Sequence, residues 1–155
     1  RLHETGSSVS FCPTSNLFLG SGLLDIQELE QNQVAYSIAT DVGGGTSFSM
    51  LQTLSEAYKV TQMKGNKLSP LKSLYLATLG NAKTLQLEDK IGSFKTGNEA
   101  DFVVLDFNST AIMSLKQSKC KTLAEKLFAM IILGDDRAVE ATYVAGTCVH
   151  KRDGK

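Results

Sequence analysis

The sequence lacks an excess of either charge, a long apolar run and paired cysteines, and each absence excludes a class of function. Its 16 Lys and Arg residues balance 16 Asp and Glu residues, so the formal net charge is zero. Zero charge argues against a basic nucleic-acid surface and against a surface that binds anionic membranes. No apolar run approaches the roughly 20 residues needed to cross a bilayer, and the polar start RLHETGSS is not typical of a signal peptide. We therefore expect neither nucleic acid nor a membrane as a partner.

Cysteine and histidine are both scarce. The three cysteines, Cys12, Cys120 and Cys148, form no C-x-x-C pair. Their odd number and wide spacing predict free thiols, packed as small apolar groups, in a reducing compartment such as the cytoplasm. The two histidines, His3 and His150, form neither an H-x-H nor an H-E-x-x-H pattern. No metal site can therefore be assembled from ligands that are neighbours in the sequence.

The composition is nevertheless that of a folded protein. Hydrophobic residues make up 42% of the 155 positions and charged residues 21%, which suits one ordinary domain or two small lobes. The sequence begins with Arg1, and RLHETG is typical of the last turn of a helix before a glycine stop. We therefore expect the chain to be part of a longer protein.

The first part of the chain alternates between predicted strands and helices. Residues 34–39 are apolar or small on both faces, which is typical of a buried parallel strand. Pro13 ends the preceding strand because proline cannot donate a hydrogen bond to a ladder. Ser69 and Pro70 are suited to the N-cap and first position of a helix. This order predicts an α/β fold. The expected elements are a strand at 8–12, a loop at 16–22, a helix near 23–33, a strand at 34–39, and helices near 47–63 and 69–86.

The pattern changes near Leu87. A strand is expected at 101–106, followed by an apolar helix in KTLAEKLFAMIIL that stops at Gly134. The last segment, AVEATYVAGTCVHKR, predicts two strands that turn at Ala145-Gly146. We therefore predict two parts, residues 1–86 and residues 87–155, the second being a β-rich lobe with one helix.

Asp41 is the strongest candidate for chemistry. It follows the strand predicted at 34–39 and precedes the glycines at 43–45, which open a helix. In parallel α/β structures reactive groups gather at the carboxyl ends of strands, and glycines let a ligand approach the backbone. The local pattern leaves a second interpretation open, in which Asp41 caps a turn and the glycines only supply positive φ angles.

Other candidate sites are weaker. No Lys follows the glycines, and the G-x-G-x-x-G spacing fails at Phe48, which argues against a phosphate loop. Cys12 has no nearby His and precedes Pro13, so a packed thiol is favoured over a nucleophile. The cysteines also do not form the P-C-x-x-C zinc signature of cytidine-type deaminases. Asp135 and Asp136 are interpreted as a solvated helix end.

Four segments together carry a resemblance to a known family. They are FCPTSNLFLGSGLLD, ATDVGGGTSFSMLQTLSEAYKV, LYLATLGNAKTLQLEDKIGSFKTGNEADFVVLD and LGDDRAVEATYVAG. Together they resemble the C-terminal portion of the bacterial guanine deaminases, within the amidohydrolase superfamily. The resemblance implies a (β/α)₈ barrel beside a β-sandwich built from both chain ends. The strands at 8–12 and 34–39 would be the last two of the barrel, and the region after Leu87 the returning half of the sandwich.

The resemblance also implies a zinc-dependent reaction. In the family one Zn²⁺ is held by an H-x-H pair, two later histidines and an Asp after the eighth strand, which Asp41 matches. A metal-bound water attacks guanine and gives xanthine and ammonia. Asp41 is thus expected to ligate the metal, to move a proton and to contact the substrate. The full-length protein is expected to be a homodimer that acts in purine catabolism.

This sequence departs from the family in what it omits. The zinc histidines, and the Gln, Arg and Glu side chains expected around the purine, belong to earlier strands. One carboxylate cannot hold catalytic zinc tightly, so we expect the chain alone to lack zinc and deaminase activity. Two barrel strands leave open edges, so we also expect self-association, element swapping or loose packing.

Two alternatives remain open at this point. The chain could belong to another amidohydrolase or chlorohydrolase, acting on a triazine, cytosine or an adenosine derivative. It could also be a truncated, non-catalytic module that acts only through a dimer surface.

Overall fold

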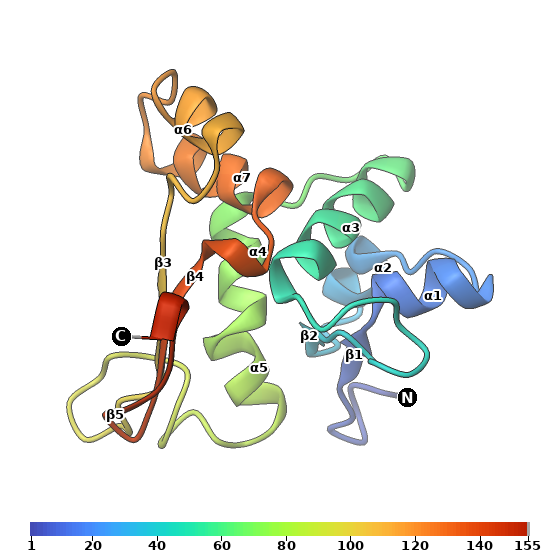
Figure 1. The fold of residues 1–155 in the computed structure, drawn as a ribbon. Coiled ribbons are helices and arrows are strands. Elements are labelled where there is room, and N and C mark those ends of the chain that lie inside the picture. The colour runs from blue at the N-terminus through green and yellow to red at the C-terminus, as the bar shows by residue number, and fades with distance from the viewer. Residues whose placement is uncertain (155) are drawn as a thin grey trace.

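A computed structural model of the chain describes residues 1–154. Helices α4 and α5 stand between a parallel strand pair with its helices on one side and a three-stranded sheet on the other (Figure 1). Among residues 1–154 no helix is long and apolar enough to cross a membrane. The elements in chain order are β1 (Val9–Phe11), α1 (Pro13–Leu19), α2 (Ile26–Gln31), β2 (Tyr36–Ile38), α3 (Met50–Met63), α4 (Pro70–Ala77), α5 (Leu79–Thr84), β3 (Phe102–Leu105), α6 (Ala111–Gln117), α7 (Leu123–Leu133), η1 (Asp136–Ala138), β4 (Val139–Val144), β5 (Thr147–Lys151) and η2 (Arg152–Gly154).

Strands β1 and β2 pair in parallel, with Val9 opposite Tyr36 and Phe11 opposite Ile38. All three residues of β2 are buried, which confirms the prediction of a buried parallel strand. The two strands leave the barrel open in this chain. Both are shorter than predicted, because the regular ladder covers three residues of each strand.

The main core lies between the parallel pair and the helices α2, α3, α4 and α7. Phe11, Ile38 and Leu54 are among its fully buried side chains, and Ile131 of α7 joins them. Helix α7 also contributes Met130 to a second core. Because α7 belongs to both cores, contacts cross the division expected between residues 86 and 87, and that division stays a prediction.

The C-terminal sheet is antiparallel, in the order β3-β4-β5. Its hairpin turns at Ala145 and Gly146, which have φ angles of 48° and 78°, as the prediction required. The prediction of one helix in this lobe is wrong, because α6 is a second one. Thr110 caps α6 by accepting a hydrogen bond from the Met113 amide, and Met113 lies in the second core.

Three predicted elements differ from the structure. The loop expected at 16–22 is wrong, since α1 starts at Pro13 and ends before Gly20, whose φ is 68°. Proline ends the strand as expected, but it also suits the first position of the next helix. The helix expected near 23–33 is shorter, with Asp25 as its N-cap. The helix expected near 69–86 breaks at Thr78, where φ is −124° and ψ is −100°.

The N-terminal residues confirm the glycine stop. The Gly6 amide donates to the His3 carbonyl at 3.1 Å and the Ser7 amide to the Leu2 carbonyl at 3.0 Å. With φ of 66° at Gly6, these two bonds form a Schellman motif.

The three cysteines are free thiols, as predicted. Cys12 and Cys120 are partly buried, but Cys148 is exposed, so the expectation of packed thiols is wrong for Cys148. It lies on β5, whose five residues are all exposed.

Candidate functional site at the end of the parallel strands

Asp41 lies three residues beyond the end of β2, in the segment that leads to α3. Its side chain is exposed. Because β1 and β2 are parallel, their carboxyl ends meet at one edge, where Cys12 follows β1 and Asp41 follows β2. The position is the one that the sequence predicted, at the carboxyl end of a buried parallel strand.

The backbone around Asp41 forms a tight turn. Asp41 has a φ of 47°, in the left-handed region, which a residue with a side chain seldom adopts. Its carbonyl oxygen accepts hydrogen bonds from the amides of Gly44, at 3.0 Å, and Gly45. Only Gly43 of the three glycines has a positive φ, 114°. The glycines therefore shape this turn, as the second interpretation proposed, but they do so for different reasons.

The Asp41 carboxylate itself does not cap the turn or the following helix. Helix α3 is capped by Ser49, whose hydroxyl accepts from the Gln52 amide. Within residues 1–154 the Asp41 carboxylate accepts no hydrogen bond and forms no ion pair. Its two oxygens are thus free to contact something outside this chain.

Two side chains from other elements hold the backbone that leads to Asp41. The hydroxyl of Thr14, in the first turn of α1, donates to the Thr40 carbonyl at 3.1 Å. The Asn81 amide, on α5, donates to the Ile38 carbonyl at 2.9 Å. The sequence pattern pointed to neither residue. Thr14 lies in the CPTSN motif, which could have drawn attention to it. No local sequence pattern distinguishes Asn81.

The neighbouring thiol is not set up as a nucleophile. Burial raises the pKa of Cys12, the negative charge of Asp41 raises it further, and the Ser10 hydroxyl opposes these effects. The thiol also donates weakly to the Ser10 carbonyl, at 3.5 Å. A thiol with a raised pKa stays protonated at neutral pH, which agrees with the interpretation of Cys12 as a partly packed thiol.

A zinc ion does not fit the described residues on their own. Nowhere in residues 1–154 do three or more His, Cys, Asp or Glu side chains gather as a metal site. The His3 ring donates instead to the Gln33 carbonyl, at 2.9 Å. Asp41 supplies only one ligating side chain, whereas catalytic zinc takes three protein ligands or more.

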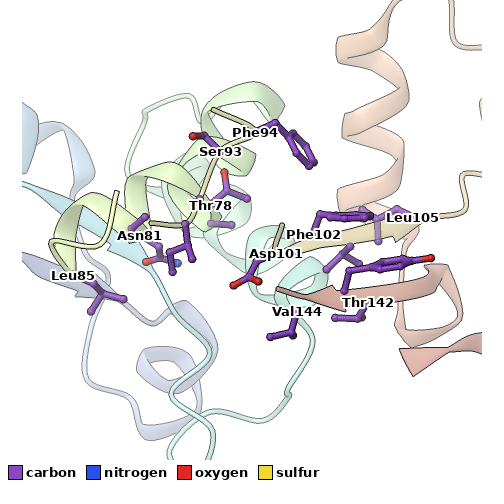
Figure 2. Close-up of a pocket in the computed structure, with 16 residues that line it drawn as sticks. Thr78, Asn81, Leu85, Ser93, Phe94, Asp101, Phe102, Leu105, Thr142 and Val144 are labelled. Atoms are coloured by element: carbon purple, nitrogen blue, oxygen red, sulfur yellow. The ribbon is translucent and has the colours of Figure 1, made fainter. Parts of the chain in front are cut away.

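A separate cavity lies between α5 and the C-terminal sheet (Figure 2). Its volume is about 700 Å³ and Asp41 does not line it. Figure 2 shows Asn81 and Leu85 on one wall and Phe102 and Val144 on the facing wall. Phe102 stacks on Tyr143 with ring centroids 4.4 Å apart. The lining of this cavity is predominantly apolar.

Comparison with known proteins agrees with this architecture. The model of the amidohydrolase family matches residues 1–149. The chain belongs to the amidohydrolase family. It is 52% identical over 153 residues to the guanine deaminase of Escherichia coli, covering 99% of this chain and 35% of that relative. The solved structure of E. coli guanine deaminase superposes with a TM-score of 0.96 over 99% of this chain and 36% of its own. The resemblance to guanine deaminases is thus confirmed for this amidohydrolase chain.

Two further solved structures hold ligands. Guanine deaminase from C. acetobutylicum, with guanine in its active site, is 26% identical, has a TM-score of 0.80, and matches 96% of this chain and 35% of its own. An adenosine deaminase from Xanthomonas campestris with bound zinc is 28% identical, has a TM-score of 0.78, and matches 94% of this chain and 32% of its own. The amidohydrolase chain thus spans about a third of the length of the relatives it matches.

Proposed function

We propose that this chain is the C-terminal part of a zinc-dependent guanine deaminase, which converts guanine and water into xanthine and ammonia. The observation that carries the proposal is the match to E. coli guanine deaminase, at 52% identity and a TM-score of 0.96 over 99% of the chain. The relatives with guanine and with zinc support the substrate and the metal. The free thiols support a reducing compartment, the cytoplasm.

Asp41 is the residue that this chain contributes to the reaction. Zinc would supply a Lewis acid when it is bound by ligands from the remainder of the enzyme. The exposed Asp41 carboxylate, with no partner among residues 1–154, can ligate the metal through one oxygen. The same carboxylate can accept a proton from the attacking water and return it to the leaving amine, which is general acid–base work. A short side chain in a fixed turn suits both roles.

The apolar cavity has a different role in this proposal. Its lining includes Phe94, which is 86% exposed, and the Phe102–Tyr143 stack. Such a surface is typical of an interface that another segment covers. We assign it to the contact with the other half of the β-sandwich, so that residues 87–155 form one half and residues 1–86 belong to the barrel. We further propose that the complete protein is a homodimer of two-part subunits.

The test uses an assembled enzyme, in which this chain replaces the matching segment of E. coli guanine deaminase. Ammonia release is measured with guanine, adenine, cytosine and an aminotriazine, and the chain alone is assayed with guanine and added zinc. We expect turnover of guanine by the assembled enzyme and none by the chain alone. Failure of the assembled enzyme to turn over guanine would contradict the proposal, and turnover by the chain alone would contradict the proposed dependence on the missing ligands.

A further inference from the structure

We infer that Thr14 is a positioning residue for Asp41: its hydroxyl fixes the Thr40 carbonyl and so sets the direction of the Asp41 carboxylate. The catalytic meaning of this inference rests on the proposed function. The hydrogen bond from Thr14 to the Thr40 carbonyl is observed directly, at 3.1 Å. It connects the segment after β1 to the segment after β2.

The turn needs such a connection because its backbone is unfavourable. Asp41 has a φ of 47°, a conformation in which Cβ lies close to the following carbonyl oxygen. Residues in sparsely populated backbone regions persist when their surroundings fix them on both sides. Here the Thr40 carbonyl is held by Thr14 before Asp41, and the Asp41 carbonyl is held by the amides of Gly44 and Gly45 after it.

Thr14 is a rigid donor. Thr14 is only 3% exposed, and it follows Pro13, whose ring fixes the start of α1. Its Oγ1 atom would lie 2.9 Å from a Cβ placed on Gly45. The hydroxyl therefore packs beside both the Thr40 carbonyl and Gly45.

The hydrogen bonds of β2 show why a side chain is needed at its end. The Ala39 amide donates to the Phe11 carbonyl of β1 at 3.0 Å, and the Ala35 carbonyl accepts from the Val9 amide. Beyond Ala39 no regular ladder to β1 continues, and β2 ends at Ile38. The Thr40 carbonyl lies just past this ladder, so β1 does not supply its hydrogen-bond donor. The Thr14 hydroxyl supplies that donor instead.

The experiment compares three variants of the assembled enzyme. Thr14→Val removes the hydroxyl and keeps the shape, and Thr14→Ser keeps the hydroxyl. Thr61→Val is the matched control, because Thr61 is a 1% exposed threonine whose hydroxyl donates to the Ala57 carbonyl at 2.7 Å inside α3. Amide hydrogen exchange of residues 41–45 is measured by mass spectrometry, together with kcat, KM and zinc content for guanine turnover.

We expect Thr14→Val to speed exchange at residues 41–45 and to lower kcat by about tenfold, because small misplacements of catalytic groups are costly. KM should stay within about twofold, Thr14→Ser should restore both readouts, and Thr61→Val should change neither. Unchanged exchange and kcat in Thr14→Val, or equal effects in Thr61→Val, would overturn the inference. A third outcome separates this inference from the proposed function. If the unsubstituted assembled enzyme does not turn over guanine but Thr14→Val still speeds exchange, the hydrogen bond is supported and the proposed function is overturned.

Discussion

A Cβ atom on Gly45 would lie 2.0 Å from the carbonyl oxygen of Thr40. This close contact is the reason that position 45 requires glycine. The backbone angle is not the reason, because the φ of Gly45 lies outside the left-handed region. Gly43 shows the opposite case, with a φ of 114° and no atom within 4 Å of the position that a Cβ would take. The two glycines give the Asp41 turn its shape through two separate physical causes.

Substituting these two glycines should therefore have unequal effects. Gly45→Ala forces backbone atoms apart and should lower the free energy of unfolding by about 2 kcal/mol or more. Gly43→Ala has room for its methyl group and should cost only about 1 kcal/mol through its left-handed backbone. Urea unfolding of the assembled enzyme measures both variants. A larger loss in Gly43→Ala than in Gly45→Ala would contradict the described turn.

Tyr36 should make the stability of the chain depend on alkaline pH. Burial raises the pKa of Tyr36 well above its ordinary value, and its hydrogen bond to Glu30, at 2.5 Å, adds to the shift. Lys72 forms an ion pair with Glu30 and lies 5.9 Å from the Tyr36 ring centroid. A raised pKa stabilises the folded state below the unfolded pKa of about 10, and this contribution is lost as the pH rises beyond it.

Tyr36→Phe tests this network. The variant should lower the free energy of unfolding near neutral pH by about 1 kcal/mol, because one partly buried hydrogen bond is lost. Its stability should then fall less steeply above about pH 10 than that of the unsubstituted protein. Unfolding curves between neutral and alkaline pH measure both effects, and identical slopes for the two proteins would argue against a raised Tyr36 pKa.

A second ion pair should act at acid pH. The Arg152 guanidinium lowers the pKa of Asp106, with its Nη2 atom 2.9 Å from the carboxylate, and the Asn108 amide lowers it further. A lowered pKa stabilises the folded state above the unfolded pKa of about 3.9, and the contribution disappears as the pH falls below it.

Asp106→Asn should therefore lower the free energy of unfolding at neutral pH by up to about 1 kcal/mol, the range of partly exposed ion pairs. Asp153→Asn is the matched control, since Asp153 is 88% exposed and 3.9 Å from the same guanidinium. The free energies of unfolding are measured by thermal or urea unfolding. Equal losses in the two variants would show that the ion pair with Asp106 stabilises the fold no more than the exposed Asp153 does.

The chain on its own should self-associate. It exposes large apolar residues, including Phe48 at 85% and Phe94 at 86%, and within residues 1–154 β2 pairs only with β1. Open strand edges and apolar faces favour contacts between copies. Light scattering at increasing concentration should show oligomers. A monomer that melts in one sharp, two-state transition would be the opposite result.

The sequence predicted the elements whose signals are local. The burial of β2 followed from its apolar residues, and Ser69 with Pro70 marked the start of α4 correctly. Helix α1 was missed because no side chain caps it at Cys12, and because Leu17, Phe18 and Leu19 are all exposed, so it lacks an amphipathic pattern. The break at Thr78 has no proline to mark it.

The candidate site was only half predictable for a similar reason. Asp41 could be chosen because a strand, an acid and three glycines are adjacent in the sequence. The contributions of Thr14 and Asn81 depend on contacts across 26 and 43 positions, which no local pattern contains. The histidine zinc ligands expected from the resemblance lie outside this sequence, which supplies only Asp41 of the expected set.

The most direct test of the central claim is the zinc content and guanine turnover of the assembled enzyme, compared with its Asp41→Asn variant. Asp136→Asn, an exposed acid distant in sequence, serves as the control. Asp41→Asn keeps the size of the side chain but can neither accept the proton nor bind the metal as a carboxylate. We expect it to lower kcat by roughly 10²- to 10⁴-fold, the range of general acid–base catalysis, and to lower zinc retention on dialysis. Zinc retention and turnover equal to those of the unsubstituted enzyme would show that Asp41 is only a turn residue.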